Sequence, residues 1–191
     1  KKGSIFAAFT RIYVTTSGTL SHEVLPGPEH KSEQDDQIYS DYLTYSTIPM
    51  HLIILEGQRR NIFNVDNVIS YIAKNPLLSP KRLSIIEKGV YAYLENDYVT
   101  AISILIPQIE HILREFYSTL GYSVTSNDMI GTMSDALGTL LNNDDIVIFD
   151  KDITRYLKTV LSNRTGWNLR NLYCHGIDDS FSLLHADRVF H

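Results

Sequence analysis

The sequence predicts an all-α protein, an antiparallel helical bundle that carries an irregular N-terminal extension. Three observations lead to this prediction. Apolar residues recur at the three- and four-residue spacing of a buried helix face along most of the chain after residue 38. Capping residues precede these stretches, and glycine or proline follows several of them. The connections are short, as they are between antiparallel neighbours in a bundle.

The first 75 residues make up the predicted extension. Residues 12–16 are aliphatic, aromatic or β-branched, which favours a strand or an extended arm. Residues 21–37 combine Pro-Gly-Pro with a polar run, which predicts an exposed loop. Helix is expected over residues 38–60 on both sides of Pro49, and this proline should break or kink it.

The predicted loop contains four side chains of the metal-ligating type. They are His22, Glu23, Glu29 and His30. Neither a helix nor a hairpin fixes their relative positions, so we interpret them as ordinary loop residues rather than as a metal site.

The remaining helices are predicted from their caps and breakers. They run from Asn64 to Ala73, from Ser79 to about Asn96, from Asp97 to Leu120, from Met129 to Leu141, from Asp150 to Leu161, and through the motif described below to Gly176. Pro107 should kink the longest of them. Trp167 should anchor the turn that begins at residue 163. Residues 146–149 form an apolar run of ambiguous type, and residues 178–180 should cap a last packed segment, 181–190.

The domain prediction separates residues 1–75, the extension, from residues 76–191, the helical domain. The chain starts without Met and ends inside an expected helix, so we expect it to be joined to further domains. Its one cysteine excludes an internal disulfide framework and suggests a reducing compartment. No stretch approaches the length of a membrane span, and no signal peptide is recognised, so the expected location is cytoplasmic.

The charge distribution bears on nucleic-acid binding. The formal net charge of −5 argues against a protein that coats nucleic acid, because such binding needs clustered cations. One region differs from this average. Between positions 150 and 175, five cations (Lys151, Arg155, Lys158, Arg164 and Arg170) face only two acidic residues, Asp150 and Asp152. If RNA binds, this stretch is where we expect it.

The stretch Arg170–Gly176 (RNLYCHG) concentrates the chemistry of the chain. In a helix, Asn171 and His175 share a face as an i, i+4 pair, whereas Arg170 lies about 140° away from His175. The two converge only if the guanidinium reaches round or a second protomer supplies one, and a dimer is the simpler solution. Such a trio can hold a phosphodiester, because arginine neutralises it, asparagine donates hydrogen bonds and histidine moves a proton near neutral pH.

Two segments resemble the HEPN superfamily of helical domains, in particular its branch with an RNxxxHG motif. They are NLRNLYCHG, residues 168–176, and the proline-containing IPQIEHILR, residues 106–114. The resemblance covers roughly residues 76–178. It implies a metal-independent RNA endonuclease without a cofactor, working as a homodimer, that leaves a 2′,3′-cyclic phosphate. It also implies that Arg170, Asn171 and His175 are catalytic, and that the context is phage defence or a toxin-like role.

The same resemblance implies supporting or substrate-binding roles for further residues. They are Glu110, Gln108, Arg114, Asn168 and Tyr173. Glu110 could orient Arg170 or simply pair with it to hold the bundle together. Gln108 and Arg114 could equally make ordinary contacts between helices. Asn168 precedes Asn171 by three residues and should share its face, and Tyr173 could stack on a base.

Alternatives remain open for the motif. His175 could be a capping histidine near a helix end, where the dipole favours a cation. Cys174 is interpreted as a buried small residue rather than a nucleophile, because adjacent helical positions point about 100° apart. The chain could also be a non-catalytic module that binds RNA or nucleotide, or dimerises, for a larger protein. A purely structural helical domain is the third possibility.

Overall fold

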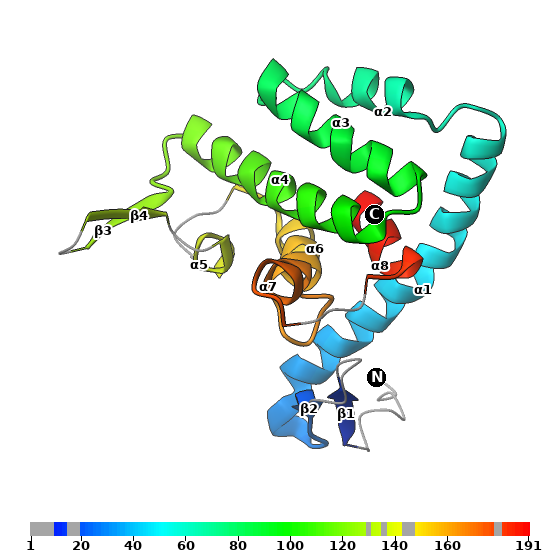
Figure 1. Ribbon diagram of the computed structural model, residues 1–191. Coiled ribbons are helices and arrows are strands. Elements are labelled where there is room, and N and C mark those ends of the chain that lie inside the picture. Colours follow the sequence, from blue (N-terminus) through cyan, green and yellow to red (C-terminus); the bar gives the residue numbers. More distant parts are fainter. Residues whose placement is uncertain (1–9, 15–19, 129–130, 135–136, 143–147, 178–180) are drawn as a thin grey trace. The chain divides into compact units, whose positions relative to one another are not determined.

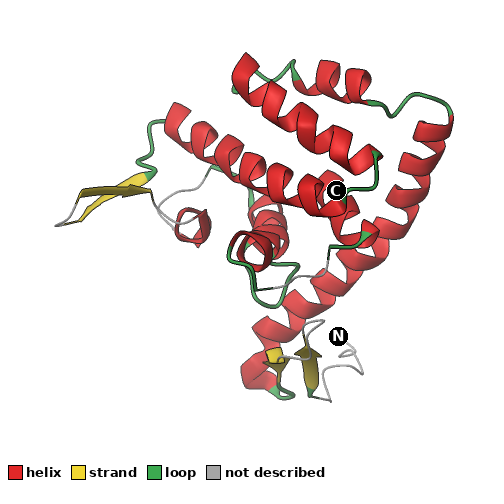
Figure 2. Ribbon diagram, viewed as in Figure 1, coloured by secondary structure: helices red, strands yellow, loops and turns green. Residues whose placement is uncertain are grey.

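The computed structural model describes residues 10–14, 20–128, 131–134, 137–142, 148–177 and 181–191. Most of these residues are helical, and the all-α prediction is confirmed (Figures 1 and 2). The helices are α1 Lys31–Arg59, α2 Val65–Ile72, α3 Pro80–Leu94, α4 Tyr98–Thr119, α5 Leu137–Asn142, α6 Lys151–Leu161, α7 Leu169–Cys174 and α8 Leu183–Asp187. Single 3₁₀ turns are η2 Pro28–His30 and η3 Arg188–Phe190. The strands are β1 Arg11–Val14, β2 Leu20–Val24, β3 Thr125–Asp128 and β4 Gly131–Ser134.

The chain forms two compact units, and α1 contributes to both. Unit 1 consists of Lys1–Ser46 and Phe149–Ser180, and unit 2 consists of Thr47–Ile148 and Phe181–His191. The boundary predicted between residues 75 and 76 falls inside unit 2, because the apolar face of α2 packs on the same core as α3 and α4.

In unit 1, antiparallel β1 and β2 precede the first half of α1, and α6 and α7 complete the unit. Trp167, only 3% exposed, anchors the turn between α6 and α7 as predicted, and its Nε1 donates to Thr44 Oγ1 of α1 at 2.9 Å. The other large apolar side chains buried in this unit are Val24, Leu43, Val160, Leu161 and Leu169.

The prediction of an exposed loop over residues 21–37 is wrong. This stretch contains β2, the turn η2 and the first turns of α1. Polar residues of this stretch form hydrogen bonds within it. For example, the buried Gln34 donates from Nε2 to the carbonyls of Leu25 at 2.8 Å and Gly27 at 3.1 Å. Such tertiary contacts turn a polar sequence into ordered structure.

Pro49 does not break α1, which continues from Lys31 to Arg59. The proline removes one backbone hydrogen bond, to the carbonyl of Tyr45, and it lies three residues after the junction of the two units. The prediction of helix on both sides of Pro49 is therefore confirmed. Of the two predicted effects of this proline, the break is wrong and the kink stays a prediction.

Unit 2 is built around α3 and α4, which lie side by side in Figure 1. The predicted caps of α2, α3 and α4 are present: side chains of Asn64, Ser79 and Asp97 accept from the backbone N–H three residues ahead, at 2.9, 3.3 and 3.1 Å. Its apolar core contains Leu78, Ile86, Val90 and Leu105. A Cβ on Gly89 would lie 2.7 Å from the Leu105 side chain, so glycine permits this close approach of α3 and α4.

The helix predicted over Met129–Leu141 is only partly present. Gly131–Ser134 instead pairs as a strand with Thr125–Asp128, and helix is limited to Leu137–Asn142. Glycine, threonine and serine have low helix propensity, which lets strand pairing prevail. Met129, Ile130 and the first two residues of the ambiguous run 146–149 lie outside the described residues.

The last segment begins later than predicted. The expected cap, residues 178–180, lies outside the described residues, and Ser182 caps α8 by accepting from His185 N at 3.4 Å.

Within the parts of the chain that the structure describes, no helix is long and apolar enough to cross a membrane.

Candidate functional site

The motif helix α7 is held in unit 1 by the loop that leads into it. Trp167 N and Asn168 N both donate to Thr159 O of α6, at 2.8 and 3.4 Å. A Cβ on Gly166 would lie 2.1 Å from the same carbonyl oxygen, so only glycine permits this approach. Asn168 then adopts a left-handed conformation, with φ of 51°, which asparagine tolerates better than most residues. The loop therefore fixes where α7 begins.

The end of α7 is fixed by its backbone conformation at Gly176. This glycine has φ of 63°, Ile177 N donates to Leu172 O at 2.8 Å, and Gly176 N contacts Tyr173 O at 3.4 Å. These are the two backbone bonds of a Schellman motif. His175 is consequently the C-cap residue, just beyond the last helical position.

The Arg170 guanidinium lies between the other two motif side chains. Its Nη1 is 2.7 Å from His175 Nε2 and 3.1 Å from Asn171 Oδ1. Arg170 and His175 thus converge within one chain, and the simpler solution expected from helical geometry, a second protomer, is not needed for this contact. This is the other arrangement expected from helical geometry, in which the long guanidinium reaches round to the histidine.

Asn171 connects the motif to the preceding loop. Its Nδ2 donates to Asn168 Oδ1 at 2.7 Å and to the Ser162 carbonyl at 3.3 Å. The expected proximity of Asn168 and Asn171 is confirmed. With its Oδ1 accepting from Arg170, the amide of Asn171 is oriented at both ends.

The contact between Arg170 and His175 has one possible direction, because a guanidinium carries only donors. Nε2 of His175 is therefore the acceptor in this arrangement. His175 is exposed and Tyr173 partly exposed, so the polar groups of the motif are accessible from solvent.

Cys174 is exposed, so the interpretation of this residue as buried is wrong. It belongs to the last turn of α7, whose buried residue, Leu169, lies at the opposite end of the helix. Adjacent positions of a helix point about 100° apart, and sequence spacing alone did not decide which of them faces solvent here.

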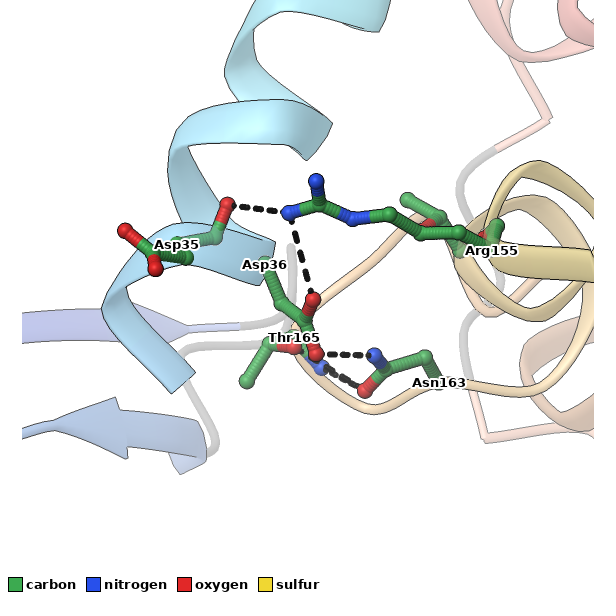
Figure 3. Close-up of polar contacts among 6 residues, drawn as sticks. Asp35, Asp36, Arg155, Asn163 and Thr165 are labelled. Atoms are coloured by element: carbon green, nitrogen blue, oxygen red, sulfur yellow. Dashed lines mark hydrogen bonds and ion pairs between the residues drawn. The ribbon is translucent and has the colours of Figure 1, made fainter. Parts of the chain in front are cut away.

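The basic stretch before the motif is partly neutralised by α1. Figure 3 shows the Arg155 guanidinium donating to Asp35 O at 2.8 Å and contacting Asp36 Oδ1 at 3.4 Å. The same guanidinium lies 4.4 Å from the Tyr39 ring centroid. Arg164 pairs with Glu33 at 3.0 Å. Two of the five expected RNA-binding cations therefore face carboxylates from a distant part of the sequence.

The supporting residues on the proline-containing helix belong to unit 2, whereas the motif belongs to unit 1. Glu110 Oε1 accepts from Arg114 Nη2 at 2.7 Å within α4, and Gln108 Oε1 accepts from Arg82 Nη1 of α3 at 3.3 Å. The interpretation of Gln108 as a residue between helices fits this contact. A role of these three residues at the motif stays a prediction.

Metal-ligating side chains do not gather within the described residues, where no group of three could hold an ion. His30 lies 3.9 Å from Glu29 and 3.8 Å from Glu33. The His22 side chain lies outside the description.

A second polar cluster, in unit 2, was not anticipated from the sequence. Asp187 is 1% exposed, accepts from the Tyr93 hydroxyl at 2.5 Å, and has its Oδ2 2.8 Å from His51 Nδ1. Burial, followed by the hydrogen bond to Asp187, raises the pKa of Tyr93 well above its usual range. The sequence offered no clear signal, because Asp187 is one of several polar residues in the final segment, 181–191.

Comparison with protein-family models, with curated proteins and with solved structures finds no match to this chain.

Proposed function

We propose that this chain is a metal-independent RNA endonuclease whose reacting groups are Arg170, Asn171 and His175. One observation carries the proposal: a single guanidinium nitrogen lies 2.7 Å from the histidine and 3.1 Å from the asparagine at the exposed end of α7. The resemblance of the two motif segments to the HEPN superfamily supports it. A reducing, cytoplasmic setting and a role in phage defence or as a toxin belong to the same proposal.

In the proposed mechanism, an RNA phosphate binds Arg170 and replaces its bond to His175. The freed Nε2 of the neutral imidazole then takes the proton of the 2′-hydroxyl. The 2′ oxygen attacks phosphorus, the bond to the 5′ oxygen breaks, and a 2′,3′-cyclic phosphate forms while the leaving 5′ oxygen takes up the proton donated by the imidazolium of His175 in a second copy of the chain. Acid-base assistance of this kind contributes about 10² to 10⁴ in rate.

The other two motif groups have electrostatic and positioning roles. Arg170 stabilises the charge that develops on the phosphoryl oxygens, which is worth about 10² to 10³ for one fixed donor. Asn171, held by Asn168 at 2.7 Å, orients the phosphate. Tyr173 offers a partly exposed ring for stacking on a base.

A homodimer is part of this proposal. The reaction needs a base and an acid, and each motif offers one histidine. Two motifs facing each other across a two-fold axis supply both groups, as the resemblance implies.

A non-catalytic module that binds nucleotide or short RNA is the second candidate. The pairing of Arg155 and Arg164 with carboxylates of α1 favours it, because fewer cations remain for a long backbone. In this case Arg170 binds a single phosphate and His175 is a capping residue.

The test of the endonuclease is cleavage of a mixed RNA pool in EDTA, with analysis of the product ends. The parent should cleave and leave cyclic phosphate, and His175→Ala should lose at least about 10² in rate. His30→Ala is the matched control, because His30 is a partly exposed histidine of the same unit that lies 3.9 Å from Glu29 and 3.8 Å from Glu33. The His30→Ala variant should cleave like the parent. Equal cleavage by His175→Ala and the parent contradicts the proposal.

Phosphate binding separates the two candidates when the parent does not cleave. A binding module should keep its affinity for a nucleotide in His175→Ala and lose it in Arg170→Ala. If neither variant nor parent binds a nucleotide or RNA, both candidate functions are refuted.

A further inference from the structure

Unit 2 contains a cavity of about 530 Å³ between α2, α3, α4 and the C-terminal turn η3. Its walls are mainly aliphatic and aromatic, with Ile72, Leu78, Ile86, Leu105, Ile109 and Phe190 among them. The volume lies within the range of small-molecule sites, which are typically apolar with few polar groups. No residue of the motif lines it.

Gln108 supplies one buried polar group in this apolar wall. The residue is only 9% exposed, and its Oε1 accepts from Arg82 Nη1 at 3.3 Å. Among the residues that the structure describes, nothing accepts from its Nε2. Two N–H donors of a nearly buried amide are therefore available to a ligand in the cavity.

Two cations accompany the cavity, one in its wall and one bonded to a wall residue. Lys74 lines the cavity, with its Nζ 5.5 Å from the Tyr71 ring centroid, and Arg82 is bonded to the cavity residue Gln108. Within the described parts of the chain, neither cation is paired with a carboxylate. An apolar cavity with an amide donor and two uncompensated cations is complementary to an apolar molecule with one anionic end.

We propose that this cavity binds a linear monocarboxylate, a free fatty acid of about eight to twelve carbons. The alkyl chain packs among the aliphatic walls, and the carboxylate accepts from Gln108 Nε2 and pairs with Arg82 and Lys74. This proposal is independent of the endonuclease, because every residue it uses lies in unit 2 and the motif lies in unit 1.

Chain length and head-group charge give the first test, by calorimetric titration of the full chain. Octanoate, decanoate and dodecanoate, each kept below its micelle concentration, should bind at one site. Affinity should rise about fourfold per added methylene until the cavity is filled. The neutral 1-decanol should bind at least about tenfold more weakly than decanoate. Absence of saturable binding, or equal binding of alcohol and carboxylate, overturns the proposal.

Charge reversal gives the second test. Lys74→Glu should weaken decanoate binding by about tenfold and leave 1-decanol unaffected. Lys88→Glu is the matched control, because Lys88 is an exposed lysine of α3 that does not line the cavity, and it should bind like the parent. Equal losses in the two variants mean that decanoate responds to net charge only, which contradicts the assigned site.

A filling substitution gives the third test. Ile109→Trp places a larger side chain in the cavity wall and should abolish binding of both ligands while circular dichroism remains that of the parent. The smaller Ile109→Phe replaces it if the tryptophan variant does not fold. Unchanged binding by a folded filling variant overturns the proposal.

Discussion

The residues of the motif serve two different purposes. Gly176 serves the backbone, because its left-handed conformation with φ of 63° ends α7 and brings His175 to the C-cap. Arg170, Asn171 and His175 carry the polar groups. The glycine of the RNxxxHG pattern therefore has a structural explanation that does not depend on catalysis, and this explanation holds for either candidate function.

Asn171 should contribute more to stability than Arg170. Asn171→Ala removes the donors to Asn168 Oδ1 and the Ser162 carbonyl, and should cost about 1–3 kcal/mol of unfolding free energy. Arg170→Ala leaves both of these bonds in place and should cost less than about 1 kcal/mol. Urea unfolding followed by the fluorescence of Trp167, the only tryptophan, measures both in unit 1.

The reverse order would change the interpretation of the motif. If Arg170→Ala unfolds unit 1 more readily than Asn171→Ala, the arginine is chiefly structural. Loss of RNA cleavage in that variant would then report unfolding rather than chemistry.

Part of this site could be predicted from residue spacing. The i, i+3 separation of Asn168 and Asn171 correctly indicated their contact. For Arg170 and His175 the spacing left two arrangements open, a guanidinium that reaches round within one chain or a second protomer, and the structure has the first. The end of α7 could not be predicted from periodicity, because backbone bonds at Gly176 set it.

At the scale of elements, Asp36 of α1 is the carboxylate that best holds the loop after α6. Its Oδ2 accepts from Asn163 Nδ2 at 3.0 Å, and Arg155 contacts its Oδ1 at 3.4 Å. Asn163 in turn accepts from Thr165 N at 3.1 Å, as Figure 3 shows. The carboxylate thus supports the turn that leads to Trp167 and α7.

Asp36→Ala should therefore lower the unfolding free energy of unit 1 by about 1–2 kcal/mol, because it leaves Asn163 and Arg155 without this acceptor. Glu33→Ala is the matched control on the same helix. Its pair with Arg164 is more exposed, and its loss should cost about 0–0.5 kcal/mol. Chemical unfolding of the two variants, followed by Trp167 fluorescence, measures both. Equal costs would show that Asp36 adds no more than a surface ion pair.

The elements that local signals define could be predicted, and those that tertiary contacts define could not. Caps at Asn64, Ser79 and Asp97 are local, and they correctly located α2, α3 and α4. The polar run 21–37 was misassigned because its order depends on contacts with distant residues, such as Arg155 with Asp36. The pairing of β3 with β4 likewise requires two segments to meet.

At the scale of the whole molecule, the two units are both discontinuous in sequence. Lys1–Ser46 packs with Phe149–Ser180, and Phe181–His191 returns to Thr47–Ile148. A boundary sought along the sequence, such as that between residues 75 and 76, cannot represent this arrangement. Contacts between segments more than 90 residues apart, for example Tyr93 with Asp187, determine the units instead.

Burial of tyrosines makes the free energy of unfolding fall at alkaline pH. Burial is the main cause that raises the pKa of Tyr93, Tyr117 and Tyr156 in the folded state. A group whose folded pKa is raised contributes stability that is fully present below its unfolded pKa, which is near 10 for tyrosine, and lost above it. Tyr93, whose folded pKa is raised well above its usual range, should lower the unfolding free energy by about 1.4 kcal/mol per pH unit above about pH 10, and Tyr117 and Tyr156 should add to this loss in the same direction.

Urea titrations between pH 8 and 11, followed by far-UV circular dichroism, measure this slope. The parent should be insensitive to pH at the lower end and lose stability steeply at the upper end. Tyr93→Phe should be less stable than the parent at pH 8, because Asp187 loses the hydroxyl that donates to it at 2.5 Å. At high pH its unfolding free energy should fall less steeply with pH than that of the parent, because one ionising tyrosine is missing. Tyr156→Phe should make the fall of the unfolding free energy with pH less steep for the same reason. A parent whose unfolding free energy stays constant to pH 11 would contradict the assignment, because the unfolded tyrosines ionise there whatever the fold does.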